Sequence, residues 1–384
     1  MDPPASIESA RWWPRGPGHR RIPRSSELVP NETTVVPGRA AWPSAPGTLS
    51  EGTRAPGTLS GGAWPSAPGT PSEGARAPGP SPAVAFVINR TLVRDPERFA
   101  RRCRAAAAAR GWAPLFLPTT REDHGEGLAR HAAAAGAELV FAVGGDGTVR
   151  ACASALAGTG VRLAIIPRGT ANLAAHALGI PHRLGAALSA GFGSHETALD
   201  LGVAEGTEFT TMAGIGLDAA VVDATRRERK LWFGWLAYAE AGLGHLHGTP
   251  NHFTVRLDGA RVLHRRARSV VVGNAGLLPG GFPLLPDARP DDGLLDVGIL
   301  APTALTDWAR IGYRVLTRSR RDDHCLERFR ARRVEITADA ELPRETDGEI
   351  IPPGRSLTVT VRPGALAIRT PLADGARPPA ILEV

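Results

Sequence analysis

The sequence predicts two ordered halves, an α/β domain with a parallel sheet followed by an antiparallel β-sandwich domain. Short apolar strands alternate with helical segments over residues 83–198, a pattern typical of a parallel sheet covered on both faces. Over residues 199–371, apolar and polar residues alternate in short runs, which is typical of antiparallel strands. A hydrophobic content of 42% in 384 residues supports a buried core in each half.

The first half has well-marked helix ends. Asp95 can cap the first helix, Pro96 suits its first turn, and Gly111 can end it. Gly136 can end the second helix in the same way. Strands are expected at residues 84–89, 114–118, 139–143 and 162–167, with helices between them at 94–111, 122–136 and 148–158.

The second half is predicted to be mainly antiparallel strands. Asp258 and Gly259 separate two alternating runs, which is a strong signal for a β-hairpin. Helical stretches at 231–246 and 303–318 interrupt the strands. A cleft between the two halves is then the natural place for a ligand. Further strands are expected in "RSVVVGN", "GLLDVGIL", "RRVEITAD", "SLTVTVRP" and "ALAIRTP".

Both ends of the chain lie outside these two halves. Residues 1–82 are rich in Pro, Gly, Ser, Ala and Thr, and the run beginning at Ala41 recurs from Ala63. Each repeat holds one Trp and almost no other large apolar side chain, so stacked repeats would bury too little surface to offset the chain entropy. We therefore expect a disordered extension over 1–82 and a short tail over 372–384.

Composition excludes several classes of protein. The formal net charge is +7, yet Lys230 is the only lysine, and its setting fits neither a Walker A loop nor the phosphate-binding strand of a protein kinase. The three cysteines, Cys103, Cys152 and Cys325, have no close spacing, so a disulfide framework or a thiolate metal site is not expected. No apolar run reaches the roughly 18 residues of a membrane span, and no signal peptide is apparent. A cytoplasmic location fits best.

A glycine-rich loop follows the third predicted strand. Gly144, Gly145 and Gly147 surround Asp146, and Thr148 opens the next helix. Backbone amides at such a strand-to-helix turn form an anion site, which glycine leaves accessible to a phosphate. A carboxylate repels phosphate, so Asp146 suits this loop if Mg²⁺ bridges the two or if it accepts a proton. The residues alone leave open a third reading, in which Asp146 only caps the helix.

A second loop of the same kind follows the fourth strand. An apolar strand passes through Pro167, Gly169, Thr170 and Asn172 into another helix. In a parallel sheet, two such loops open at the same carboxyl edge, where ligands of open α/β folds bind. The two loops could therefore hold one nucleotide between them.

These motifs together resemble the catalytic domain of the diacylglycerol kinase and sphingosine kinase superfamily, particularly its soluble bacterial lipid kinases. The resemblance covers roughly residues 83–371 and implies a fold like that of NAD kinases and diacylglycerol kinases. The motifs that carry it, in the order and approximate spacing of that superfamily, are "GGDGT" (144–148), "PRGTAN" (167–172), "ALDLG" (198–202), "MAGIGLDAAV" (212–221), "VVVGN" (270–274), "PDDGLLDV" (290–297) and "TDGE" (346–349).

The resemblance implies an ATP-dependent lipid kinase that uses Mg²⁺, and it assigns roles to residues. Asp146 and Asp200 are similar to family carboxylates that organise Mg²⁺ through water, and Glu349, or its neighbour Asp347, matches the general base. A second, structural Mg²⁺ site is implied at Asp292 with the main-chain carbonyls of Arg289 and Leu294. The nucleotide contacts implied are Thr120, Gly144, Gly145, Asp146, Gly147, Thr148, Gly169, Thr170 and Asn172. The residues alone leave "PDDGLLDV" and Asp347-Gly348-Glu349 open to being simple turns.

One position departs from the family pattern. Many bacterial members have an acidic residue after the Asn of the second loop, whereas Leu173 follows Asn172 here. The change removes one potential metal contact and puts a preference for diacylglycerol over a sphingoid-like lipid in doubt. An NAD kinase, which shares "GGDGT", and a non-catalytic nucleotide or lipid sensor are the alternatives.

A lipid kinase implies a membrane lipid as substrate and peripheral contact with an anionic membrane. The arginine clusters at 226–230, 264–268 and 328–333 could serve that contact, at about 1 kcal/mol per residue near the surface. They contain few interleaved aromatic residues, so no nucleic-acid partner is expected. The oligomeric state stays open, with a homodimer as one option.

Overall fold

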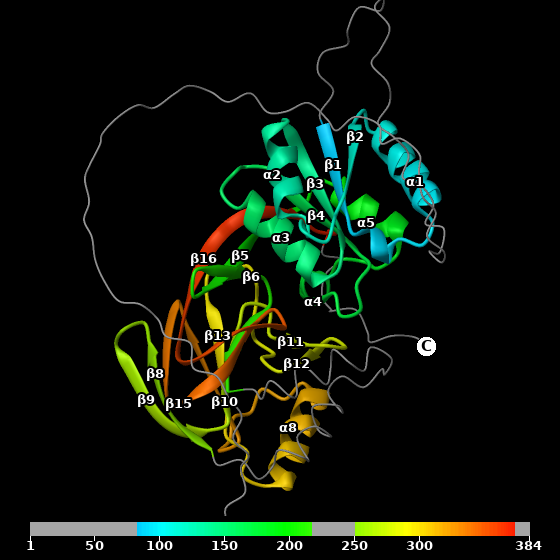
Figure 1. The fold of residues 1–384 in the computed structure, drawn as a ribbon. Helices are drawn as coiled ribbons and strands as arrows, with labels where there is room; N and C mark the ends of the chain where they lie inside the picture. The colour runs from blue at the N-terminus through cyan, green and yellow to red at the C-terminus, as the bar shows by residue number, and fades with distance from the viewer. Residues whose placement is uncertain (1–82, 217–249, 373–384) are drawn as a thin grey trace, which may run out of the picture. The chain divides into compact units, whose positions relative to one another are not determined.

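The computed structural model describes residues 83–216 and 250–372 of the chain, with the first half at the top of Figure 1. The predicted extension at 1–82, the helix at 231–246, the arginine cluster at 226–230 and the tail from residue 373 lie outside the described residues.

The first half contains the predicted parallel sheet. Its strands run in the order β4-β3-β1-β2, and each neighbouring pair is parallel. The strands are β1 (Ala83–Ile88), β2 (Ala113–Pro118), β3 (Ala137–Gly144) and β4 (Arg162–Pro167). The helices are η1 (Arg90–Leu92), α1 (Pro96–Ala108), α2 (Glu126–Ala134), α3 (Asp146–Leu156), α4 (Leu173–Ala177) and α5 (Leu184–Gly191).

Helices cover both faces of this sheet, as the near-continuous apolar strands predict. Val84 and Phe86 of β1 pack in one buried cluster with side chains of α1 and α5, whereas Ala85 and Val87 pack in another with side chains of α2 and α3. Figure 1 shows the two helix pairs on opposite sides of the strands. Because the helices cover the two faces, the carboxyl ends of the strands stay accessible at the sheet edge, where the loops lie that lead into the helices.

The sequence signals at the helix ends are partly confirmed. The side chain of Asp95 accepts a hydrogen bond from the amide of Arg98, so it caps α1. Helix α2 begins only at Glu126, later than predicted, because Asp123 Oδ1 accepts hydrogen bonds from the amides of Gly125 and Gly127 and stabilises a turn there.

The second half is rich in antiparallel strands, as predicted. Most of its buried apolar side chains form one core between the strands. The hairpin at Asp258-Gly259 is confirmed, with positive φ angles of 50° and 71° at the two turn residues. The strands are β5 (Glu196–Ala204), β6 (Thr207–Phe209), β7 (Met212–Ile215), β8 (Asn251–Leu257), β9 (Arg261–Ala267), β10 (Ser269–Gly273), β11 (Leu277–Leu278), β12 (Phe282–Pro283), β13 (Leu295–Leu300), β14 (Leu326–Ala331), β15 (Arg333–Thr346) and β16 (Glu349–Arg369), and the helix among them is α8 (Leu305–Thr317).

One strand joins the two halves of the fold. β16 pairs with β15 and β5 in the antiparallel direction, and near its end Ile368 pairs in parallel with Leu163 of β4. The turn between β15 and β16, at the other end of the same strand, carries the predicted "DGE" motif. The hydrogen-bonded sheet is therefore continuous from the nucleotide-type strands to the strands of the second half.

Two glycines of α5 provide a test of how tightly this helix packs on the sheet. A Cβ at Gly191 would overlap the ring of Phe141, whereas Gly185 on the same helix is exposed, with only the end of Arg102 near its Cβ position. We predict that Gly191→Ala lowers the free energy of unfolding by about 1 to 3 kcal/mol through overpacking. Gly185→Ala should be neutral or stabilising by up to about 1 kcal/mol, because alanine favours the helix. Urea denaturation of both variants measures the difference, and equal stabilities would contradict this packing.

Candidate functional site

The two glycine loops predicted from sequence lie directly against each other. β3 and β4 are neighbours, with Gly144 opposite Pro167, and the amides of Arg168 and Gly169 donate to the Gly144 carbonyl at 2.8 and 3.3 Å. A Cβ at Gly169 would stand only 2.5 Å from the Cα of Gly145. The main chains of the two loops therefore touch, and only glycine fits at the contact.

The three glycines of the first loop have different surroundings. A Cβ at Gly144 would meet the side chain of Thr148 at 2.5 Å, and one at Gly145 would meet Gly169 at 3.1 Å. At Gly147 nothing lies within 4 Å of the Cβ position. Two glycines thus serve packing of the loops, and the third keeps open space in front of the first turn of α3.

Asp146 links the loops through its side chain. Its Oδ1 accepts a hydrogen bond of 3.2 Å from the amide of Ala174, in the first turn of α4. It does not cap α3, whose N-cap is Gly145 and has no side-chain cap. Burial raises the pKa of the Asp146 carboxyl, the Ala174 hydrogen bond opposes this, and the negative charge of Asp347 adds to it.

Asn172 and its neighbours close the second loop. Asn172 has a left-handed backbone with φ of 47°, and its side-chain amide exchanges two 2.8 Å hydrogen bonds with the backbone of Gly169. It is 5% exposed, so its polar atoms serve the loop itself. Leu173 is also buried, whereas Thr170 is exposed. Of these three side chains, Thr170 is therefore the one placed to meet a ligand.

A cavity of about 750 Å³ opens beside the first loop. It brings together Thr120, Gly145, Gly147 and Thr148, all predicted from sequence to contact a nucleotide. Thr120 holds its own turn, since its Oγ1 accepts hydrogen bonds from the amides of Glu122 and Asp123. Sequence reasoning missed the basic groups of this cavity, which are Arg90, Arg94, Arg121 and His124. The sequence could have indicated them, because all four residues follow the carboxyl ends of β1 and β2, where ligands of open α/β folds bind.

Asp347 fixes the turn between β15 and β16. Its two carboxylate oxygens accept hydrogen bonds from the amides of Thr210, Thr211 and Met212 and from both threonine hydroxyls. With five donors on two oxygens, Asp347 is saturated. Its side chain positions the turn and contributes negative charge toward Asp146, and its engaged oxygens leave little access for a substrate hydroxyl.

Glu349 reaches the first helix of the nucleotide-type half. Its Oε2 forms a 2.6 Å ion pair with Arg150 in the second turn of α3, just beyond the glycine loop. The Glu349 side chain is 49% exposed, so its carboxylate is accessible to a substrate. The fold thus brings one predicted base candidate to α3, where its partner Arg150 is 199 residues away in sequence.

Glu345 is a carboxyl group that the sequence analysis did not identify. It lies on β15 opposite Gly214, two residues before Asp347. Burial raises the pKa of the Glu345 carboxyl to about 7, and the charge of Asp347 adds to the effect. Glu345 is therefore about half protonated at pH 7 in the folded chain. No sequence motif marks it, because its environment is made by β7 and the Asp347 turn.

Asp200 organises the turn at residues 290–294. Its two carboxylate oxygens accept hydrogen bonds from the amides of Gly293 (2.6 Å) and Gly364 (2.7 Å), and its own amide donates to the Pro290 carbonyl. At 2% exposure, this buried carboxylate links β5, the turn and β16 through hydrogen bonds.

Asp292, at the predicted second metal site, already has a cationic partner. Its Oδ2 pairs with Arg330 and its Oδ1 accepts a hydrogen bond from the Leu294 amide. Arg330 also pairs with Asp296 at 3.3 Å, and burial raises the pKa of Asp296 to about 6. Arg289 pairs its side chain with Asp291. A cation held here by Asp292 and the carbonyls of Arg289 and Leu294 would have to share or displace the Arg330 guanidinium.

Comparison with known proteins places the chain in a family. A family model described as the diacylglycerol kinase catalytic domain matches residues 83–204, and one described as the YegS C-terminal NAD kinase beta sandwich-like domain matches residues 211–370. A probable lipid kinase YegS-like from Pseudomonas fluorescens is 35% identical over 294 residues, covering 71% of this chain and 93% of that protein. The chain belongs to the YegS-like lipid kinase family. A Pseudomonas aeruginosa protein of the same name is 36% identical over 281 residues, covering 70% and 89% of the two chains.

A solved structure supports the fold of this YegS-like family member. The crystal structure of a diacylglycerol kinase from Bacillus anthracis superposes with a TM-score of 0.58 at 22% identity, covering 76% of this chain and 98% of that one. The predicted resemblance and fold class are thus confirmed. In the described residues, no helix is both long enough and apolar enough to cross a bilayer.

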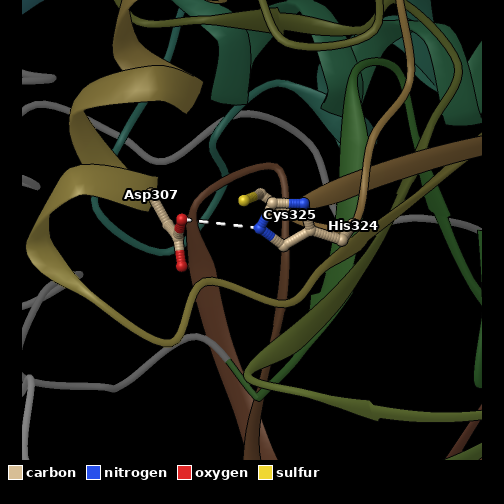
Figure 2. Close-up of side chains that lie close together, drawn as sticks. All are labelled: Asp307, His324 and Cys325. Atoms are coloured by element: carbon tan, nitrogen blue, oxygen red, sulfur yellow. Dashed lines mark ion pairs between the residues drawn. The ribbon is translucent and has the colours of Figure 1, made fainter.

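A further group of potential ligands lies far along the chain, at the start of α8. The ligand atoms of Asp307, His324 and Cys325 all lie within 4.8 Å of one another (Figure 2). Asp307 Oδ2, however, accepts hydrogen bonds from Thr303 and Ala304, and the Arg310 guanidinium stands 4.0 Å from Oδ1. Burial raises the pKa of the Cys325 thiol to about 11. The carboxylate is already engaged by these donors and the thiol remains protonated near neutral pH, so the group anchors α8.

The glycine contact yields a first prediction. Gly169→Ala should force the two loops apart, lowering both the affinity for nucleotide and the free energy of unfolding, the latter by about 1 to 3 kcal/mol. Gly147→Ala is the matched control, because its methyl group meets no protein atom and stands in front of α3. It should weaken nucleotide binding without loss of stability. Titration calorimetry with Mg·ATP and thermal denaturation test both, and wild-type affinity in Gly169→Ala would refute the role of the contact.

The raised pKa of Glu345 yields a second prediction. The pKa of Glu345 is about 7 in the folded chain and 4.5 ordinarily, so the folded chain holds this proton more tightly than the unfolded chain does. The resulting stabilisation is complete below pH 4.5 and is lost as the pH rises from 4.5 through 7. Glu345→Gln cannot ionise, so its free energy of unfolding at pH 8 should exceed that of wild type by roughly 1 to 3 kcal/mol, and the two should match at about pH 4. Identical pH profiles of stability for the two proteins would show that Glu345 titrates normally.

Proposed function

We propose that the chain transfers the γ-phosphoryl group of ATP to a hydroxyl group of a membrane lipid. The observation that carries the proposal is the meeting of three parts at one place. The glycine loops touch each other, Asp146 joins them, and Glu349 arrives at α3 from the second half through its ion pair with Arg150. Phosphoryl transfer requires mainly positioning and neutralisation of charge, and these parts supply both.

The nucleotide would lie in the cavity beside the first loop. The open position at Gly147 lets phosphate oxygens approach the amides at the start of α3, where the helix dipole favours negative charge. Arg90, Arg94 and Arg121 line the same cavity, so guanidinium groups can neutralise the phosphates in a chain that has a single lysine. The cavity volume of about 750 Å³ is within the range of small-molecule sites.

The surroundings of Asp146 fit a divalent cation. Burial and the charge of Asp347 raise the pKa of Asp146. The ionised carboxylate is thus poorly solvated and lies near a second negative charge, and a bound cation would stabilise it. Oδ1 of Asp146 is held by the Ala174 amide at the start of α4. A Mg²⁺ ion bound at this carboxylate, directly or through water, would neutralise the phosphates of ATP.

Glu349 is placed to accept the proton of the lipid hydroxyl. Its carboxylate is half exposed, and Arg150 holds it beside α3. In the proposed step the hydroxyl oxygen forms a bond to the γ-phosphorus, the bond to the ADP oxygen breaks, and the hydroxyl proton passes to Glu349. Arg150 is then a positioning residue, and Asp347 positions the turn that carries Glu349.

The names of the relatives favour a lipid as the acceptor over NAD. The relatives from Pseudomonas fluorescens and Pseudomonas aeruginosa carry the name probable lipid kinase, and the match spans both halves of the chain. Diacylglycerol and a sphingoid-like lipid are the two acceptor classes to compare first. Incubation with labelled ATP, Mg²⁺ and a total lipid extract, in parallel with NAD, tests the choice. Label in the lipid fraction supports the proposal, whereas label only in NADP would replace it with an NAD kinase.

The two carboxylates allow a sharper test. Asp146→Asn keeps an acceptor for the Ala174 amide but removes the charge, so the fold should persist while lipid phosphorylation falls by at least 10³-fold, on the order of the contribution of electrostatic stabilisation in phosphoryl transfer. Glu349→Gln should lower kcat by roughly 10²- to 10⁴-fold with little change in nucleotide affinity. Asp258→Asn, at a distant hairpin turn, is the control and should keep full activity. Wild-type turnover in either site variant would overturn the assignment.

A further inference from the structure

We propose that the outer face of α8 docks on the surface of an anionic lipid bilayer. The inference rests on the proposed function, because a lipid kinase must reach a substrate that resides in a membrane. The argument starts from two apolar side chains. Tyr313 is 68% exposed and Leu316 is 48% exposed, and because they are three residues apart they share one face of the helix.

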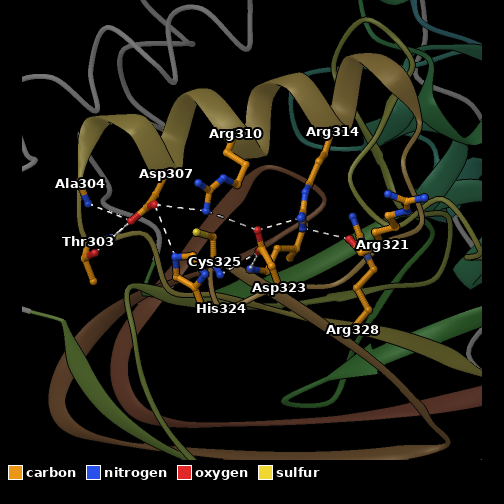
Figure 3. A network of polar contacts seen from close by, with 11 residues as sticks. Thr303, Ala304, Asp307, Arg310, Arg314, Arg321, Asp323, His324, Cys325 and Arg328 are labelled. Carbon is orange, nitrogen blue, oxygen red and sulfur yellow. Dashed lines mark hydrogen bonds and ion pairs between the residues drawn. The ribbon is translucent and has the colours of Figure 1, made fainter.

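The opposite face of α8 is fixed to the protein. Ile311 and Val315 are each 5% exposed and pack in a cluster with Leu284 and Leu285. Polar contacts add to this anchor (Figure 3). Arg314 forms a 2.8 Å ion pair with Asp323 and donates to the Arg321 carbonyl, and the Asp307 carboxylate caps the start of the helix. The helix therefore cannot rotate to bury Tyr313 and Leu316, which remain on the surface.

Two cations without acidic partners lie just beyond these apolar residues. Arg318 and Arg321 are exposed, and neither forms an ion pair with a described residue. Their neighbour Arg320 pairs with Asp287 at 2.9 Å. Apolar side chains flanked by free guanidinium groups match the boundary between acyl chains and anionic headgroups, where Tyr and Arg are favoured.

The arginine clusters identified in the sequence fit this role less well. Within the clusters at 264–268 and 328–333, most of the side chains are already engaged. The pairs are Arg265 with Glu327, Arg328 with Asp322, Arg330 with Asp292 and Asp296, and Arg333 with Glu335. Paired charges attract an anionic surface weakly, so the free cations at the end of α8 are the better candidates.

The position of α8 connects this surface to the proposed site. The α8 side chains Ile311 and Val315 pack in the same cluster as Phe282 of β12 and Leu278 of β11, and β11 contacts α4, which begins at the second glycine loop. Figure 1 shows α4, the β11-β12 pair and α8 following one another along one side of the fold. A bilayer that holds α8 would lie near the elements that carry the second loop.

The size of the patch favours a bilayer over a protein partner. A stable protein interface needs about 800 Å² from each partner, with a buried aromatic anchor surrounded by further contacts. Two exposed apolar side chains at a helix end are too few for that, whereas shallow insertion of an amphipathic helix face combined with charge attraction needs no matching pocket.

Vesicle sedimentation without ATP tests the proposal directly. The full chain is mixed with vesicles of phosphatidylcholine alone or with phosphatidylglycerol added. We expect binding to the anionic vesicles that weakens with salt, and a partition coefficient at least tenfold lower in Tyr313→Ser/Leu316→Ser. Loss of two free arginines in Arg318→Ser/Arg321→Ser should lower it roughly 10- to 30-fold, at about 1 kcal/mol for each residue. Val262→Ser, at an exposed apolar residue of β9, is the control and should bind as wild type does.

Other outcomes would overturn the proposal. Equal vesicle binding by wild type and both double variants would exclude α8 as the docking surface, as would equal binding to neutral and anionic vesicles. If Tyr313→Ser/Leu316→Ser changed only the oligomeric state in sedimentation velocity, the face would instead contact a second copy of the chain. Phosphorylation of a short-chain, water-dispersed lipid is measured separately and should be unchanged in the double variants. A chain that binds vesicles but phosphorylates no lipid would refute the proposed function and leave the docking surface standing.

Discussion

The contact between Gly145 and Gly169 is the constraint on which the arrangement of the site depends. Because the main chains of two strand-to-helix loops touch there, the amides at the start of α3 and α4 open at one place on the sheet edge. A side chain at either glycine would separate them. Asp146 then spans the contact and takes the Ala174 amide as its partner, which fixes a buried carboxylate beside a position left open for phosphate.

The second half of the chain contributes to the site through the turn that the Asp347 carboxylate stabilises. Five donors from residues 210–212 hold Asp347, and the turn that carries Asp347 also brings Glu349 to Arg150 on α3. The same strand, β16, returns to pair with β4 below the second loop. The proposed phosphate site and the proposed base are thus tied to one continuous sheet, which keeps their separation fixed without direct contact between all of the residues concerned.

Much of this could be predicted from the sequence, because the signals were local. The hydrophobic periodicity and the positions of glycine and proline predicted the parallel sheet, the hairpin at Asp258 and the start of α1. Two loops at the carboxyl edge of one sheet were also expected to meet. What the sequence could not give depends on contacts between distant residues. Asp146 caps α4 rather than its own helix, Asp200 brackets a turn from β5, and the pKa of Glu345 is set by strands far away in sequence. The arginines at 264–268 and 328–333 looked available, and their ion pairs became visible only in the fold.

The central claim is that both loops form one phosphate site, and hydrogen exchange tests it most directly. Exchange of backbone amides is compared in the free chain and with Mg²⁺ and a non-hydrolysable ATP analogue. The account predicts that amides at 145–148 and at 168–174 become protected together, at the same analogue concentration, while those of the Asp258 hairpin are unchanged. Protection of the amides of only one loop, or of neither loop, would contradict the account.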